Sequence, residues 1–293
     1  MKTLLLLTIM NAATLVAQPM PLAGLISQVA DGGGWKTCIY VYNSNSYPTG
    51  AEIYFYGDDG KPMRFWLAGY GDPSSSIALS WVCPMCVSSV CTANAGYETA
   101  QGYARIIAWP QLPASSNPSR NAPISSWAVF TYRNPETGQE QEAAVPGQPR
   151  SDIPLVIPYD NYRFATGIAI VNSNAHPLNI QVTVRDAYSG GTQIFSPEPA
   201  KIIRQTTWLF QAGEKRTFNL VDAFPETAGK TGVIQFQAIY GSNAGLYGIG
   251  LRFNPTGSFT TIFSPTWQAQ LGMVRRCPTR SGKLRRRFSL DSE

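Results

Sequence analysis

An internal repeat constrains the fold of this 293-residue chain more than any other feature of its sequence. The segment TCIYVYNSN at residues 37–45 returns as TGIAIVNSN at residues 166–174, and later segments stay aligned at nearly the same offset. Each copy is long enough to be a domain and too long to be one unit of a solenoid. We therefore predict two homologous domains, residues 24–146 and residues 153–265.

The two copies differ in length at one place. The Asn-Pro pair at residues 134–135 corresponds to the Asn-Pro pair at residues 254–255, and the offset between the copies is ten residues smaller here than before. The first copy therefore carries an insertion, at residues 109–126, whose Pro, Ser and Asn content predicts a surface loop. Residues 143–154 are rich in Pro and polar residues, which predicts a linker between the domains.

Apolar residues alternate with other residues in both copies. Ile39 and Val41 share one face of an extended segment, and Ile53 and Phe55 share one face of the next. The matching residues of the second copy are Ile168, Ile170, Val182 and Val184. Turn residues separate these segments, and no stretch of a dozen residues shows a helical pattern. We predict an all-β chain of two tandem antiparallel β-sandwiches with about seven strands each.

This pattern resembles the tandem immunoglobulin-like or fibronectin-like modules of exported bacterial proteins. Short strands separated by turn signals occur throughout both copies. The Cys, Trp and Cys spacing of a true immunoglobulin domain does not occur in the sequence. The resemblance implies a binding or spacing role and assigns no functional residue.

The first residues have the layout of a secretory signal peptide. One Lys precedes an apolar run and small residues follow, so we predict a signal peptide at residues 1–17. A buried strand or an uncleaved anchor is the alternative, although the run is short for a membrane span. We expect no transmembrane segment after the signal peptide. The mature protein is therefore expected to be secreted, periplasmic or at the cell surface, where thiols tend to oxidise.

The net charge of +5 comes from the C-terminal end of the chain. Residues 273–293 contain seven basic and two acidic residues, and the remaining residues balance. We interpret residues 266–293 as a basic, disordered tail that either is solvated without a partner or contacts an acidic surface through Arg275–Arg287. Because the rest of the chain is neutral, we expect no nucleic-acid partner.

The sequence gives little support to catalysis. The only histidine, His176, lies in a turn, and no Gly-x-Ser-x-Gly element precedes a helix. Carboxylates are present, but nothing singles out two of them as a catalytic pair, and Asp58 and Asp59 are expected in a hairpin turn. We therefore predict that the protein is not an enzyme and uses no cofactor or metal. An exported hydrolase is the third choice.

The cysteines are the sharpest local feature. Cys83, Cys86 and Cys91 follow a C-x2-C-x4-C spacing, and Cys38 is the fourth thiol of the first copy. Four thiols could bind zinc, and the C-x-x-C pair could be redox-active. In an exported protein disulfides are favoured instead, and four cysteines allow three pairings. Cys277 in the tail is left over, either free or bridging two chains.

Tyrosines occupy the alternate positions of the same two segments in the first copy. With the apolar residues inward, Tyr40 and Tyr42 must point to the opposite face, as must Tyr54 and Tyr56 with Glu52 beside them. If the two strands are neighbours, these five candidate ligand-binding residues form one aromatic surface. Such a surface suits stacking on sugar rings or packing against a partner domain. Half-exposed tyrosines are also common in strands without any function.

These observations favour an exported, non-enzymatic pair of modules with a binding, adhesion or structural spacer role at the cell envelope or outside the cell. Its partner would be a polysaccharide or another envelope protein. The alternative is a pair of carbohydrate-binding modules that uses the tyrosine surface.

Overall fold

The fold is known from a computed structural model. It describes residues 22–110, 124–187, 201–241, 243, 245–255 and 257–262. The predicted signal peptide, most of the predicted inserted loop and the basic tail with Cys277 lie outside these residues. Within them the regular structure is β, as predicted, apart from one short α-helix and one 3-10 turn, and it forms four antiparallel sheets of four strands each.

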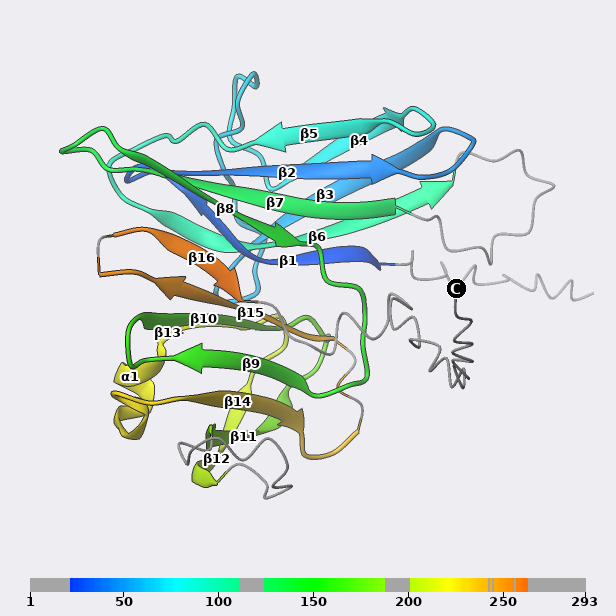
Figure 1. The fold of residues 1–293 in the computed structure, drawn as a ribbon. Coiled ribbons are helices and arrows are strands. Elements are labelled where there is room, and N and C mark those ends of the chain that lie inside the picture. Colours follow the sequence, from blue (N-terminus) through cyan, green and yellow to red (C-terminus); the bar gives the residue numbers. More distant parts are fainter. Residues whose placement is uncertain are drawn as a thin grey trace, which may run out of the picture.

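Residues 22–146 form two of these sheets, which we call the N-terminal sandwich (Figure 1). Its strands are β1 (Leu22–Asp31), β2 (Trp35–Asn43), β3 (Thr49–Gly57), β4 (Ser76–Val82), β5 (Val87–Cys91), β6 (Ala100–Pro110), β7 (Ile124–Arg133) and β8 (Glu140–Pro146). The sheets have the orders β1-β6-β3-β4 and β5-β2-β7-β8. Ile39, Val41, Ile53 and Phe55 lie in the core between them, so the inward face predicted from the alternation is confirmed.

Residues 155–262 form the other two sheets, the C-terminal sandwich. Its elements are β9 (Leu155–Asp160), β10 (Ala165–Asn172), β11 (Leu178–Asp186), β12 (Ile202–Phe210), β13 (Lys215–Asn219), α1 (Leu220–Ala223), η1 (Pro225–Thr227), β14 (Thr231–Ala238), β15 (Leu246–Phe253) and β16 (Phe259–Ile262). The sheet orders are β9-β14-β11-β12 and β13-β10-β15-β16. Strand for strand, this repeats the order of the N-terminal sandwich.

The strand number and order differ from the expectation of about seven immunoglobulin-like strands. Among the described residues each sandwich has eight strands, because one more strand, β8 or β16, follows the Asn-Pro pair and forms a hairpin with the strand before it. In an immunoglobulin domain the first strand pairs with the second and the last with the sixth. Here β1 pairs with β6 and β7 pairs with β2. Alternation of apolar residues shows which face a strand buries. Strands pair through backbone hydrogen bonds, which do not depend on side chains, so alternation does not show which strands become neighbours.

The repeated Asn-Ser-Asn phrase is a structural clamp. The buried Asn43 amide donates hydrogen bonds to the carbonyl oxygens of Tyr47 and Val82, each at 2.9 Å. Its side-chain oxygen accepts from the backbone N–H of Asn45 at 3.0 Å. The second copy repeats this arrangement: Asn172 donates to the carbonyl oxygens of His176 and Gln211 and accepts from the N–H of Asn174. In both copies the clamp joins the turn after one strand to a distant segment of the other sheet, which explains why the phrase recurs.

The two sandwiches pack against each other through apolar residues. One cluster joins Phe130 and Val145 of the N-terminal sandwich to Ala169 and Ile249 of the C-terminal sandwich. A second cluster joins Leu25 and Tyr103 to Val171 and Tyr247. Figure 1 shows the edge strands β8 and β16 side by side at this interface, where the Thr261 hydroxyl donates to the carbonyl oxygen of Ala144 at 2.9 Å.

The segment between the sandwiches is held by hydrogen bonds on both sides. Residues 143–146 of the predicted linker belong to strand β8, and the backbone of Gln148 exchanges two hydrogen bonds of 2.9 Å with Leu25 in β1. The Gln148 side chain donates to the carbonyl oxygen of Gly248 at 2.6 Å and accepts from its N–H at 2.9 Å. One residue of the linker thus ties β1 of the first sandwich to β15 of the second.

Candidate functional site

The predicted surface of four tyrosines does not form. Tyr40 and Tyr42 lie in β2, whereas Tyr54 and Tyr56 lie in β3, and these strands belong to different sheets of the N-terminal sandwich. Because both strands turn their apolar residues into the shared core, the two tyrosine pairs face outward on opposite sides. The prediction of the outward direction is correct, and the prediction of a single surface is wrong, because consecutive strands here cross between sheets instead of pairing.

Tyr40 and Tyr42 belong to an aromatic surface that the sequence did not delimit. The Tyr40 ring stacks on Trp127 of β7, with ring centroids 5.2 Å apart and an interplanar angle of 7°. The Tyr42 hydroxyl contacts the sulfur of Met85 at 3.6 Å, and Val87 lies opposite Tyr42 on β5. Met85 and Val87 are 66% and 51% exposed. We call these five residues the aromatic face.

Tyr54, Tyr56 and Glu52 lie on the outer side of the other sheet. The hydrogen bond between Glu52 and Tyr54 is the main reason that the pKa of Tyr54 rises to about 12. Tyr56 stacks on Tyr103, with centroids 5.1 Å apart, and packs against the second interface cluster. Burial raises the pKa of Tyr103 to about 12. Tyr56 therefore serves the packing between the sandwiches, which was one of the roles expected for the tyrosine surface.

The C-terminal sandwich buries the face that corresponds to the aromatic face. Ala169 and Val171 occupy the positions that match Tyr40 and Tyr42, and both are buried at the interface with the N-terminal sandwich. The same sheet face is therefore covered in one copy. In the other copy it carries half-buried tyrosines beside exposed apolar side chains.

The four cysteines of the N-terminal sandwich form two disulfides, as predicted. Of the three possible pairings, the structure contains one. Cys38 pairs with Cys91 across strands β2 and β5, and Cys83 pairs with Cys86 in the turn between β4 and β5. Thiols joined in disulfides are not available as zinc ligands, so the alternative of a tetrahedral zinc site is contradicted. Among the described residues no group of His, Cys, Asp and Glu is arranged to hold a metal ion.

The remaining candidates from the sequence are separate from one another. His176 is exposed in its turn, where its backbone carbonyl accepts the hydrogen bond from Asn172. Asp59 lies in the turn after β3 and forms an exposed ion pair with Lys61 at 3.0 Å. The neighbouring Asp58 has a different role, because it pairs with a lysine of the other sandwich.

An ion pair crosses the interface between the sandwiches. The Nζ atom of Lys215 lies 2.8 Å from Asp58 Oδ1, and the lysine side chain has no exposed surface. Burial lowers the pKa of Lys215, and Asp58 opposes this shift. The backbone N–H of Lys215 also donates to the carbonyl oxygen of Asp58 at 2.9 Å. Gly60 and Gly213, both with positive φ, touch beside this pair, where a Cβ on Gly60 would come within 2.7 Å of the Gly213 backbone.

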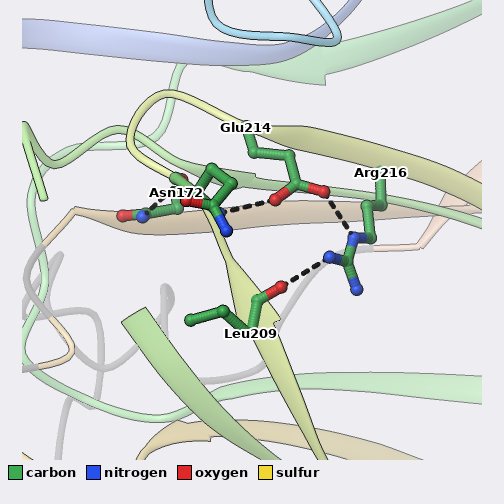
Figure 2. A network of polar contacts seen from close by, with 5 residues as sticks. Asn172, Leu209, Glu214 and Arg216 are labelled. Carbon is green, nitrogen blue, oxygen red and sulfur yellow. Dashed lines mark hydrogen bonds and ion pairs between the residues drawn. The ribbon is translucent and has the colours of Figure 1, made fainter. Parts of the chain in front are cut away.

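A polar network fixes the turn that carries Lys215 (Figure 2). The Arg216 guanidinium donates to Glu214 at 2.7 Å and to the carbonyl oxygen of Leu209. Glu214 also accepts from the backbone N–H of Gln211, whose carbonyl oxygen accepts from Asn172 at 2.9 Å. The network holds the β12–β13 turn in the position in which Lys215 meets Asp58.

A pocket of about 550 Å³ lies between the two sandwiches. The N-terminal sandwich contributes Gln28, Trp35 and Phe130, and the C-terminal sandwich contributes Phe218 and Phe253. Sequence reasoning missed this site. The residues that line it come from both copies and from strands far apart in the chain, and no local pattern indicates that they meet.

Comparisons with known proteins add no family to this description. No protein-family model and no curated protein sequence matches the chain. No helix among the described residues is long and apolar enough to cross a membrane.

Proposed function

We propose that this protein is an exported, non-enzymatic binding protein made of two homologous β-sandwich domains, which recognises a partner at the cell envelope through the aromatic face. The duplicated strand order and the duplicated asparagine clamp support the origin of the two domains from one ancestor. The two disulfides support export, because disulfides persist in oxidising compartments.

One observation carries the proposal of a binding face. The sheet face that the C-terminal sandwich uses for packing is half-exposed in the N-terminal sandwich, where Tyr40 and Tyr42 stand in place of Ala169 and Val171 and Trp127 stacks on Tyr40. Tyrosine and tryptophan are enriched in binding surfaces because they offer a large apolar area with little loss of side-chain entropy. Exposed Met85 and Val87 extend the apolar area, which favours another envelope protein as the partner.

A polysaccharide is the second candidate partner, and the Tyr40–Trp127 stack favours it. Sugar rings bind by lying against aromatic rings, and the nearly parallel rings of Tyr40 and Trp127 are both half-exposed. The two candidates differ in the sensitivity of the partner to protease, which makes them separable in one experiment.

The test is co-sedimentation of the purified protein with cell envelopes of the organism that encodes it. We expect Trp127→Ala and Tyr40→Ala to weaken binding by about tenfold or more, since aromatic residues in interfaces are often worth more than 1.4 kcal/mol. Tyr54→Ala is the matched control, because Tyr54 is an outward tyrosine on the opposite sheet. Protease treatment of the envelopes should abolish binding to a protein and spare binding to a polysaccharide.

Two results would contradict the proposal. The first is wild-type protein that stays in the supernatant with envelopes from every growth condition tested. The second is equal loss of binding in Tyr54→Ala and Trp127→Ala, because such a loss would not depend on the aromatic face.

A further inference from the structure

The pocket between the sandwiches exists because the two copies differ at one row of residues. Its floor contains Ala165, Gly167 and Ala169, alternate residues on one face of β10. The matching positions in β2 of the N-terminal sandwich are occupied by the larger residues Lys36, Cys38 and Tyr40. A Cβ on Gly167 would lie 2.9 Å from the ring of Phe253, so even a methyl group at this position would crowd the wall. The hollow therefore depends on small residues placed where the other copy has large ones.

The walls of the pocket are aromatic and uncharged. Trp35, Phe130, Phe218 and Phe253 line it, and none of the lining residues in the described part of the chain is acidic or basic. A volume of about 550 Å³ is within the range of sites that enclose small organic molecules. Since a charged ligand would lose its hydration without gaining a countercharge here, the lining selects a neutral and mainly apolar molecule.

One polar group in the wall lacks a partner. The Gln28 side-chain oxygen is buried and accepts no hydrogen bond from the described residues. The amide nitrogen of the same side chain makes only a long contact, 3.5 Å, with Gln101, another residue of the wall. This oxygen has almost no accessible surface, so it meets a ligand only after the Gln28 side chain turns toward the pocket. Because buried acceptors are nearly always paired, a hydrogen-bond donor on a ligand would favour this turn.

We propose that this pocket binds a neutral, mainly apolar small molecule that carries one hydroxyl or N–H donor. The rings of the wall contact its apolar body, and the oxygen of Gln28 accepts its hydrogen bond. The site is formed by both sandwiches and is separate from the aromatic face, so it does not depend on the partner proposed above.

The probe for this proposal is N-phenyl-1-naphthylamine, a neutral molecule with fused aromatic rings and one N–H group, whose fluorescence rises in apolar surroundings. We expect saturable binding to the full chain with one site per chain. The anionic analogue 8-anilino-1-naphthalenesulfonate should bind at least tenfold more weakly, because its sulfonate finds no countercharge in the pocket.

Two variants locate the bound probe. Thr217 is an exposed residue at the rim of the pocket, so Thr217→Trp should fill the entrance and weaken binding tenfold or more without disturbing the core. Thr207→Trp is the matched control, since Thr207 is an exposed threonine on the other sheet of the same sandwich. Gln28→Leu should weaken binding of the amine by about fivefold and leave binding of 1-phenylnaphthalene, which has no N–H, unchanged.

The proposal is overturned if the neutral probe shows no saturable binding, or if Thr217→Trp binds it as tightly as Thr207→Trp does. Equal affinity for the neutral and the anionic probe would also refute the chemical class. If Gln28→Leu weakens binding of both neutral probes equally, the oxygen of Gln28 is not the acceptor and that assignment fails.

Discussion

The ion pair between Lys215 and Asp58 provides the most direct test of how the sandwiches are held together. The lysine side chain is fully buried, whereas the aspartate side chain is 39% exposed. Asp58→Asn removes the charge and keeps the size of the side chain and the backbone contact. The substitution leaves Lys215 at the interface without a countercharge.

The expected loss of stability follows from this burial. Removing one partner of a buried ion pair costs about 3–5 kcal/mol. Because water reaches the position of Asp58, we expect about 2–3 kcal/mol instead. For a chain of this size that corresponds to a fall in Tm of roughly 5–10 °C. Urea unfolding monitored by tryptophan fluorescence measures the loss directly.

The pH dependence of the loss has a definite sign. In the variant, Asp58 no longer opposes the effect of burial, so the pKa of Lys215 falls further below its ordinary value of 10.5. Between this lowered pKa and the ordinary value, the unfolded chain binds more protons than the folded chain, so the free energy of unfolding rises with pH. The loss of unfolding free energy in Asp58→Asn, relative to the wild type, should therefore be largest near neutral pH and shrink as the pH approaches 10.5.

Two further variants make the reasoning refutable. The double substitution Asp58→Asn with Lys215→Met removes both charges and should recover most of the lost stability, because apolar replacement of a buried pair is often neutral. Asp59→Asn changes the neighbouring exposed carboxylate and should leave the unfolding midpoint unchanged. If Asp58→Asn unfolds like the wild type at neutral pH, or if the double variant is as unstable as the single variant, the pair does not hold the interface.

Two other predictions concern features that the copies share or do not share. Asn43→Ala and Asn172→Ala should each lower the free energy of unfolding by about 2–4 kcal/mol, because each removes the same set of buried hydrogen bonds. Urea unfolding of the two variants measures this loss. A large loss of stability in only one of them would show that the two clamps are not equivalent. Replacing both cysteines of a disulfide by Ala should cost about 4 kcal/mol for Cys38–Cys91, which closes a separation of 53 residues, and about 2 kcal/mol for Cys83–Cys86, with a separation of 3. Thermal unfolding compares the two double variants, and the reverse order of stability would contradict the loop-closure argument.

The sequence predicted those features that depend on local pattern. Alternation placed Ile39 and Val41 inward and Tyr40 outward, because side chains in a strand point to opposite faces with a period of two residues. The register of the repeat predicted that the strand order of one half recurs in the other. The spacing of the cysteines, together with the expected export of the protein, predicted disulfides but not which cysteines pair.

The features that the sequence could not predict depend on contacts between distant strands. The separation of Tyr40 from Tyr54 arises because the chain crosses from one sheet to the other between β2 and β3, and a turn of the same composition would also suit a hairpin. The pocket requires Gln28 and Phe218 to meet, although they belong to different copies. The sequence around Asp58 indicates a turn residue for backbone reasons, whereas its role at the interface depends on a lysine far along the chain.

The contact between the sandwiches is asymmetric, and this asymmetry bears on the partner of the aromatic face. The outer face of β10 packs on the outer face of β1 and β6 and on Phe130 and Val145 of β7 and β8, so unlike surfaces of two related domains meet. Because the contact joins unlike surfaces, a further domain can in principle repeat it. The N-terminal sandwich still presents the outer face of β2, which corresponds to the β10 face. That copy carries Tyr40 where β10 has Ala169, and a buried tyrosine needs far more space than an alanine. The aromatic face therefore cannot dock as β10 does, and the surface it binds must differ in shape from that of a third copy of the same domain.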